Sequence, residues 1–232
     1  PPPEREWRTV KVAKTVSDWK AKLISIPGAT ITDDKLPDGT PATRFSVPGP
    51  GDYGGDSRCE LQIAPAGNEG ERWAYEWGIY VAKQTVIPTA FDKPTVVAQH
   101  HGNNQAGYGG GASLDSANLL WARIRGGHEL TLKGSHDYEY EDEGAIGQIK
   151  RERLHTVRLE ILWHREHGDY RALLDGVEGF HYTDIPTWPL GEKDGEPTEN
   201  IMWRLGLYPS AGKVAGPMVM WTTPCKFEVA AS

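Results

Sequence analysis

Polar side chains recur at every second position in three short segments that lie far apart in the chain. The segments are Arg58–Gln62 (RCELQ), Val97–His101 (VAQHH) and Arg204–Tyr208 (RLGLY). Successive side chains of a β-strand point to opposite faces of its sheet, so this alternation predicts three strands with one polar face each. Arginine, glutamine, histidine and tyrosine bind anions and move protons, whereas an ordinary solvated face carries lysine, glutamate and threonine. Three such strands side by side would form a concave anion site that transfers protons.

The rest of the chain also has the pattern of a β-protein, because glycine and proline interrupt it at short intervals. The candidate strands are residues 42–47, 58–63, 73–81, 95–101, 119–124, 129–133, 155–164, 169–174, 201–208 and about 219–229, the last interrupted by Pro224. A short helix is expected at Val16–Ile24, with Thr15 or Ser17 as its cap. The pattern predicts an antiparallel β-sandwich.

Two long segments, residues 102–116 and 183–200, are expected to be loops that wall a cleft, since long loops over a rigid sheet often carry binding groups. The chain contains no internal repeat, low-complexity tract or linker that would divide it. We therefore expect a single domain over residues 1–232.

Charge and hydropathy narrow the range of partners. The formal net charge of −7 argues against nucleic acid and membrane surfaces, which both need a basic footprint, but it allows an anionic substrate in a local cationic cleft. No apolar run is long enough to span a membrane, and no N-terminal segment has the charged-then-apolar pattern of a signal peptide, although a mature secreted chain would also lack one. We expect a secreted monomer.

Aromatic residues and cysteines leave alternatives open. Nine Trp and nine Tyr against four Phe form a bias toward polar aromatics, which stack on sugar rings but are also good strand and core residues. The two cysteines, Cys59 and Cys225, could form one disulfide or remain two buried thiols.

Several phrases resemble a known family. They are Arg58-Cys-Glu-Leu, the segment Gly70–Tyr80 (GERWAYEWGIY), Gln99-His-His101, Trp163-His164 with Gly168-Asp-Tyr and Leu174-Asp-Gly, and Arg204-Leu-Gly-Leu-Tyr208. In this order they resemble the β-jelly-roll polysaccharide lyases: the glucuronan lyases, the heparin lyase I type and, more distantly, the small alginate lyases. The resemblance covers roughly residues 40–228. It implies a concanavalin-like jelly roll of two antiparallel sheets that cleaves a uronic-acid polysaccharide by β-elimination, as a carbon–oxygen lyase.

The family motifs also suggest roles. The Arg-x-Glu-Leu, Gln-x-His and Tyr-x-Lys-x-Gly-x-Tyr strands of the alginate lyases match Arg58/Glu60, Gln99/His101 and Arg204/Gly206/Tyr208. We expect Tyr208, His101, Gln99 and Arg58 to be catalytic, and Glu60, Gln62 and Arg204 to bind substrate. Met202 departs from the family pattern because it stands where the earlier tyrosine of the last motif would be.

Elimination chemistry needs these residue types independently of the resemblance. The C5 proton of a 4-linked uronate becomes acidic only when the neighbouring carboxylate is neutralised. Arg58 offers a guanidinium fork for that carboxylate, and Gln99 offers an amide donor. His101 has the pKa of a base near neutral pH, and the Tyr208 hydroxyl can protonate the departing O4 or act as base itself if a nearby cation lowers its pKa. The first substrate to test is glucuronan.

Each of these residues also has an ordinary structural explanation. Arg58 and Glu60 could form a surface ion pair, Gln99 and His101 could be satisfied core polar groups, and Tyr208 could be a sheet aromatic. No cofactor is required and no transition-metal site is expected, although loop carboxylates and carbonyls would suit a Ca²⁺ ion. A jelly-roll glycoside hydrolase and a non-catalytic carbohydrate-binding module remain alternatives, although the Glu-x-Asp-x-x-Glu strand of laminarinase-type hydrolases is absent.

Overall fold

The computed structural model describes residues 6–54, 57–63, 67–87, 95–102, 118–125, 130–135, 144–185, 187, 192–193, 196–197, 201–209 and 213–231. For some of these residues only the backbone is described: 101–102, 118–125, 130, 132–135, 192–193 and 196–197. Within these ranges the chain is almost wholly β-strand, with one 3₁₀ helix, η1 (Val16–Asp18). The predicted all-β class is confirmed.

Two antiparallel sheets account for most of the strands. The larger sheet has nine strands in the order β14 (Val177–Ile185), β13 (Gly168–Leu174), β12 (Leu154–Leu162), β7 (Arg72–Val81), β19 (Met218–Thr222), β4 (Pro41–Val47) and β3 (Thr30–Lys35), with β20 (Cys225–Ala230) pairing both β7 and β1 (Trp7–Ala13). The smaller sheet has seven, in the order β11 (Gly144–Ile149), β10 (Leu130–Ser135), β9 (Asn118–Arg125), β8 (Thr95–Gly102), β17 (Ile201–Pro209), β6 (Cys59–Ile63) and β2 (Ala21–Ile24).

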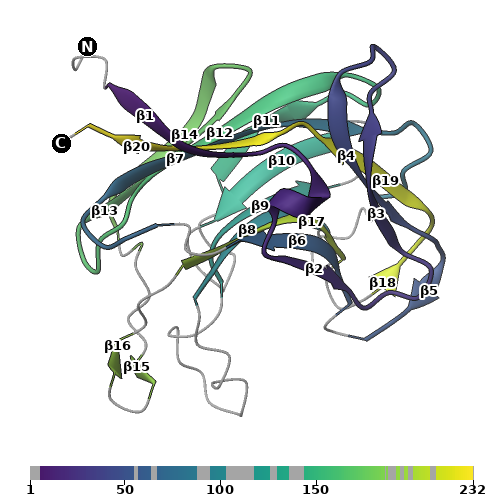
Figure 1. The fold of residues 1–232 in the computed structure, drawn as a ribbon, viewed down its shortest axis with the longest axis horizontal. Helices are drawn as coiled ribbons and strands as arrows, with labels where there is room; N and C mark the ends of the chain where they lie inside the picture. Colours follow the sequence, from purple (N-terminus) through teal and green to yellow (C-terminus); the bar gives the residue numbers. More distant parts are fainter. Residues whose placement is uncertain are drawn as a thin grey trace.

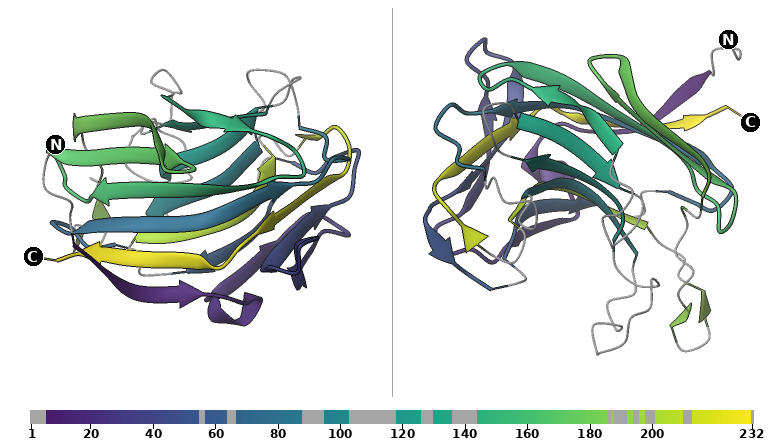
Figure 2. Two further views of the ribbon diagram at one scale, coloured as in Figure 1. Left: turned by 90° about the horizontal axis from the view of Figure 1, so that it is seen from above. Right: turned by 180° about the vertical axis from the view of Figure 1, so that it is seen from behind.

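Two short ribbons complete the strands. They pair β15 (Glu192–Lys193) with β16 (Glu196–Pro197) and β5 (Gly51–Asp52) with β18 (Lys213–Val214). Figures 1 and 2 show the main sheets as two curved layers, with β1 and β20 side by side at the edge of the larger one.

The core lies between the two sheets and follows from strict alternation along the strands. Trp203, Leu205 and Leu207 of β17 face Tyr75 and Trp77 of β7 across it, and all five belong to one cluster of buried apolar residues. Burying aromatic side chains of this size supplies much of the driving force for stacking two sheets. The alternate residues of the smaller sheet are therefore left on its open face, which is turned away from the larger sheet.

The expected helix at Val16–Ile24 is wrong. Only Val16–Asp18 forms one 3₁₀ turn, and a capping box between Thr15 and Asp18 caps its N-terminus. The chain then enters β2, where Leu23 pairs with Glu60 of β6. Pairing with a sheet edge outweighs a short segment's weak helix propensity.

The sequence pattern also missed four longer strands, β1, β3, β11 and β14. β1, β3 and β14 have mostly exposed side chains, so they lack the apolar alternation that marks a strand, and β11 contains two glycines. The predicted loop at 183–200 begins inside β14 and holds β15 and β16. The expected loop at 102–116 lies, after Gly102, outside the described residues.

The cysteines are two buried thiols and form no disulfide. The Cys59 thiol donates toward the carbonyl oxygen of Thr30 at 3.5 Å, and burial raises its pKa to about 12. The single-domain assignment of residues 1–232 stays a prediction.

Candidate active site on the smaller sheet

The three strands with alternating polar residues are neighbours in the smaller sheet, in the order β8, β17, β6. Arg204 of β17 is opposite Gln62 of β6 on one side and opposite Gln99 of β8 on the other. Residues paired across strands share one face of the sheet, so this row crosses all three strands on the open face.

Glu60 and Gln99 form a buried hydrogen bond across the sheet. The Gln99 Nε2 donates to Glu60 Oε1 at 2.7 Å. Gln99 is 1% exposed and Glu60 is 0% exposed. Burial raises the pKa of the Glu60 carboxyl, and the positive charges of Arg204 and Arg58 oppose that rise. The carboxylate predicted to bind substrate is therefore beneath the accessible surface.

Arg204 is buried in the same layer, with 1% of its surface exposed. Its Nε donates to Gln62 Oε1 at 2.9 Å. A buried guanidinium needs compensating acceptors, and its charge acts on Glu60. Arg204 and Glu60 thus offer a ligand almost no surface, whereas Gln62 is half-buried.

Arg58 and Tyr208 are the more accessible pair, and both are half-buried. The Arg58 guanidinium carbon lies 5.3 Å from the centroid of the Tyr208 ring, a cation–π contact. Arg58 stands just before β6, where its backbone N–H donates to Ser25 Oγ and its carbonyl accepts from the Ser25 N–H. This clamp fixes the start of the strand, and hence where the guanidinium lies.

A bulge in β17, relative to β8, lies directly before Tyr208. The strand pairs regularly with β6 from Trp203 to Leu207, but three steps from Leu205 to Tyr208 match only two steps in β8. Gly206 makes this possible, since its φ is 153° and an added Cβ would lie 2.3 Å from the carbonyl oxygen of Cys59. The glycine of the RLGLY segment is therefore a steric requirement.

The backbone of His101 pairs with Met202, two residues along β8 from Gln99. Its side chain lies outside the described residues, so its predicted place in the site is neither confirmed nor contradicted. Arg58, Glu60, Gln62, Gln99, Arg204 and Tyr208 are brought together on the open face. No assigned role is tested by this placement.

His100 is a residue for which the sequence gave no functional signal. Its ring is fully buried, 4.4 Å from both Tyr75 and Trp203 and 5.0 Å from Trp163 between ring centroids. Burial lowers the pKa of His100 well below its usual value, so the imidazole is neutral. His100 stands between Gln99 and His101 in β8, so its buried ring packs this strand against the core.

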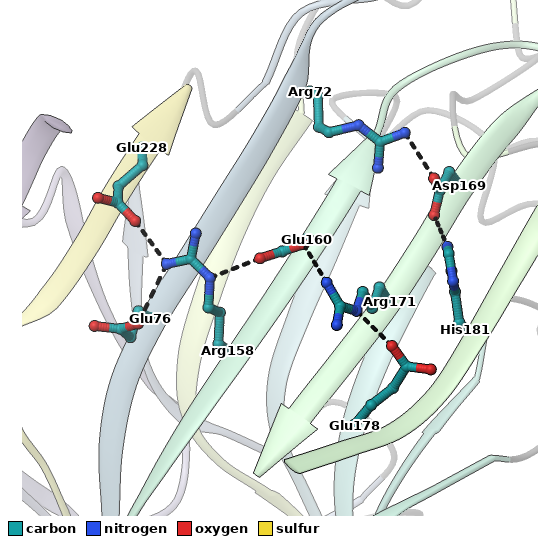
Figure 3. Close-up of polar contacts among 9 residues, drawn as sticks. All are labelled: Arg72, Glu76, Arg158, Glu160, Asp169, Arg171, Glu178, His181 and Glu228. Carbon is teal, nitrogen blue, oxygen red and sulfur yellow. Dashed lines mark hydrogen bonds and ion pairs between the residues drawn. The ribbon is translucent and has the colours of Figure 1, made fainter. Parts of the chain in front are cut away.

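The larger sheet carries a second polar surface on its outer face, the outer charge network (Figure 3). Arg158 contacts Glu228 at 2.6 Å, Glu160 at 2.8 Å and Glu76 at 3.2 Å. The other members are Arg72, Asp169, Arg171, Glu178 and His181, joined by contacts of 2.6 to 3.4 Å. Each arginine drawn there contacts at least one carboxylate.

A groove of about 300 Å³ also lies on the outer face of the larger sheet. Its lining residues are Val12, Glu76, Trp77, Gly78, Thr156, Thr223, Pro224 and Lys226. This set contains no arginine, histidine or tyrosine, so it does not offer the proton-transferring anion chemistry predicted from the sequence.

Within the described ranges, no group of three or more His, Cys, Asp or Glu side chains is placed to hold a metal ion. In the same part of the chain, no helix is long and apolar enough to cross a membrane.

No family model and no curated protein matches the sequence. Solved structures do match. The endo-β-1,4-glucuronan lyase of the fungus Trichoderma reesei superposes with a TM-score of 0.72 at 16% identity, covering 97% of this chain and 96% of that one. The marine alginate lyase of Zobellia galactanivorans gives 0.56 at 14%, covering 96% and 94%. The alginate lyase of Klebsiella pneumoniae gives 0.56 at 12%, covering 85% and 83%.

At these identities the likeness establishes the fold. The predicted β-jelly roll is confirmed, and the resemblance inferred from the sequence segments holds at the level of the fold.

Proposed function

We propose that this protein is a polysaccharide lyase that cleaves a 4-linked uronic-acid polysaccharide by β-elimination, with glucuronan as the first substrate to test. The observation that carries the proposal is the open face of β6, β17 and β8, where Arg58 and Tyr208 are in contact beside the buried Glu60–Gln99 hydrogen bond. The similar folds of a glucuronan lyase and alginate lyases support it.

In the proposed reaction the substrate carboxylate is neutralised first. Arg58 supplies the guanidinium, and Gln99, which is 1% exposed, supplies an amide donor. Neutralisation stabilises the enolate-like intermediate that forms when the C5 proton leaves. The low dielectric of the buried layer strengthens this effect.

Proton transfer falls to Tyr208 and His101. The Tyr208 hydroxyl protonates the departing O4, and the Arg58 guanidinium carbon, 5.3 Å from the centroid of the Tyr208 ring, places a positive charge beside this residue. Where H5 and O4 lie on the same side of the sugar, Tyr208 serves as both base and acid. Where they lie on opposite sides, His101 is the base.

The test is a substrate panel of glucuronan, alginate, heparin-type and hyaluronan-type polymers. Each elimination creates a 4,5-unsaturated end that absorbs in the ultraviolet, together with a new reducing end. We expect both signals to rise in parallel on at least one polymer, most strongly on glucuronan. New reducing ends without the absorbance would replace elimination by hydrolysis.

A non-catalytic carbohydrate-binding module is the alternative from another class. It would bind one of these polymers without producing either signal. We further propose that the protein is a secreted monomer that needs no cofactor for the reaction, and that any Ca²⁺ it binds is structural. Activity that survives exhaustive chelation would support the last two statements.

A further inference from the structure

Resting on the proposed function, we infer that Glu60 is a positioning residue rather than a substrate ligand: it orients the Gln99 amide so that an N–H faces the substrate carboxylate. The inference starts from burial. Glu60 exposes none of its surface, so it cannot act by touching a polymer, although the sequence had suggested that it binds substrate.

The hydrogen bond between the two side chains fixes the amide's direction. An ionised carboxylate can only accept, so Glu60 Oε1 selects the NH₂ group of Gln99 at 2.7 Å and excludes its carbonyl. One N–H is then anchored, and the second is the one that the inference assigns to the substrate carboxylate. A reversed amide would turn its carbonyl oxygen toward an anionic substrate and repel it.

Burial raises the pKa of the Glu60 carboxyl, and two neighbouring positive charges oppose that rise, toward the ionised form that this selection needs. Arg204 on β17 and Arg58, just before β6, act on the carboxylate, while Leu23 of β2 and Gly206 of β17 are opposite it. The second carboxylate oxygen, Oε2, has no hydrogen-bond partner among the described residues. Gln99 is therefore the group that the carboxylate orients.

The first experiment is a double-mutant cycle with Glu60→Gln and Gln99→Leu. Glu60→Gln keeps the shape but removes the acceptor-only group, so kcat should fall about 10²-fold, as misplaced reacting groups do, with KM nearly unchanged. In the Gln99→Leu background the same change should have no further effect on kcat, because the residue it acts through is gone. Equal losses in both backgrounds would overturn the inference.

A matched control separates positioning from general damage. Glu228 is 4% exposed and is on the larger sheet, so Glu228→Gln neutralises a similarly buried carboxylate far from the site. It should leave kcat unchanged. If it lowers kcat as much as Glu60→Gln does, the effect belongs to folding and the inference fails.

A measurement on the unmodified chain covers the case in which Glu60→Gln does not fold. The Gln99 side-chain NH₂ signals, identified by their loss in Gln99→Leu, should shift in NMR spectra with the same midpoint as the Glu60 carboxyl carbon. If the Gln99 NH₂ signals do not shift as the Glu60 carboxyl titrates, the inference is overturned. An inactive wild type that still shows the linkage would instead reject the proposed lyase reaction and leave the orientation of Gln99 supported.

Discussion

The open face of the smaller sheet and the outer face of the larger sheet use the same residue types for opposite purposes. Arg158 has three carboxylates within 3.2 Å, and its side chain is 17% exposed. On the smaller sheet, the buried Glu60 accepts from the neutral Gln99, while Arg58 lies over an aromatic ring. The outer face joins its arginines to carboxylates at a partly solvated surface, whereas the smaller sheet holds its charges in and beside a buried layer that also contains a neutral amide and an aromatic ring.

Accessibility separates the two faces a second time. The outer charge network is partly solvated, so water and salt weaken each of its ion pairs. The site layer excludes water, so each of its electrostatic interactions acts at greater strength. Arginine and glutamate at alternate positions therefore do not identify a site until their burial and partners are known.

The largest difference between the faces should appear in Tyr208→Phe. Loss of the hydroxyl removes the proposed general acid, so kcat should fall about 10²–10⁴-fold with folding intact. Tyr80→Phe is the matched control, because Tyr80 packs edge-on against Trp221 in the larger sheet, and its activity should equal that of the wild type. The kcat of both variants is measured on the polymer that the wild type cleaves fastest. Near-wild-type activity of Tyr208→Phe would remove Tyr208 from the mechanism.

Arg158→Met should show the reverse behaviour. It strips one guanidinium from three carboxylates, so the free energy of unfolding should fall by about 2 kcal/mol, the range for hydrogen bonds to charged groups. Urea unfolding measures this loss. The kcat at a temperature where the variant is folded should not change, and a parallel drop in kcat would show that the two faces are coupled.

Arg58→Lys and Arg171→Lys compare the two faces with one chemical change. Lysine keeps the charge but not the planar fork that fits a carboxylate. At Arg58 we expect about a tenfold loss of kcat/KM, equal to about 1.4 kcal/mol. At Arg171, which contacts Glu178 and Glu160, kcat/KM should be unchanged. Equal losses in the two variants would contradict the distinction.

Acid should weaken the core beneath the site through His100. Because its pKa is lowered on folding, the unfolded chain binds a proton more readily below about pH 6.5, the ordinary histidine value. The contribution of the neutral, buried His100 ring to the free energy of unfolding is therefore fully present above that pH. It declines by up to about 1.4 kcal/mol per pH unit as the pH falls toward the folded-state pKa.

The variant for this prediction is His100→Phe, compared with the wild type by urea unfolding across that pH range. Phenylalanine keeps an aromatic ring among Tyr75, Trp163 and Trp203 but cannot titrate. The quantity to compare is the slope of the unfolding free energy against pH, because the larger phenylalanine ring also changes the overall stability. Identical slopes would show that His100 is not protonated on unfolding.

Much of the site's placement was readable from the sequence because alternation is a local property. The period of two in RCELQ and RLGLY placed Arg58, Glu60 and Tyr208 on one face before any pairing was known. The degree of burial of each side chain could not be predicted, because the burial of Glu60 depends on strands distant in the sequence. The edge strand β14 was missed for a related reason: its exposed residues carry no apolar pattern.

The bulge at Gly206 makes the length of β17 as important as its composition. The strand keeps step with β6 while it falls one residue out of step with β8. Deleting one residue there would turn Tyr208 from one side of the sheet to the other, because each step reverses a side chain. The proposed site therefore depends on the number of residues in β17 as well as on their identity.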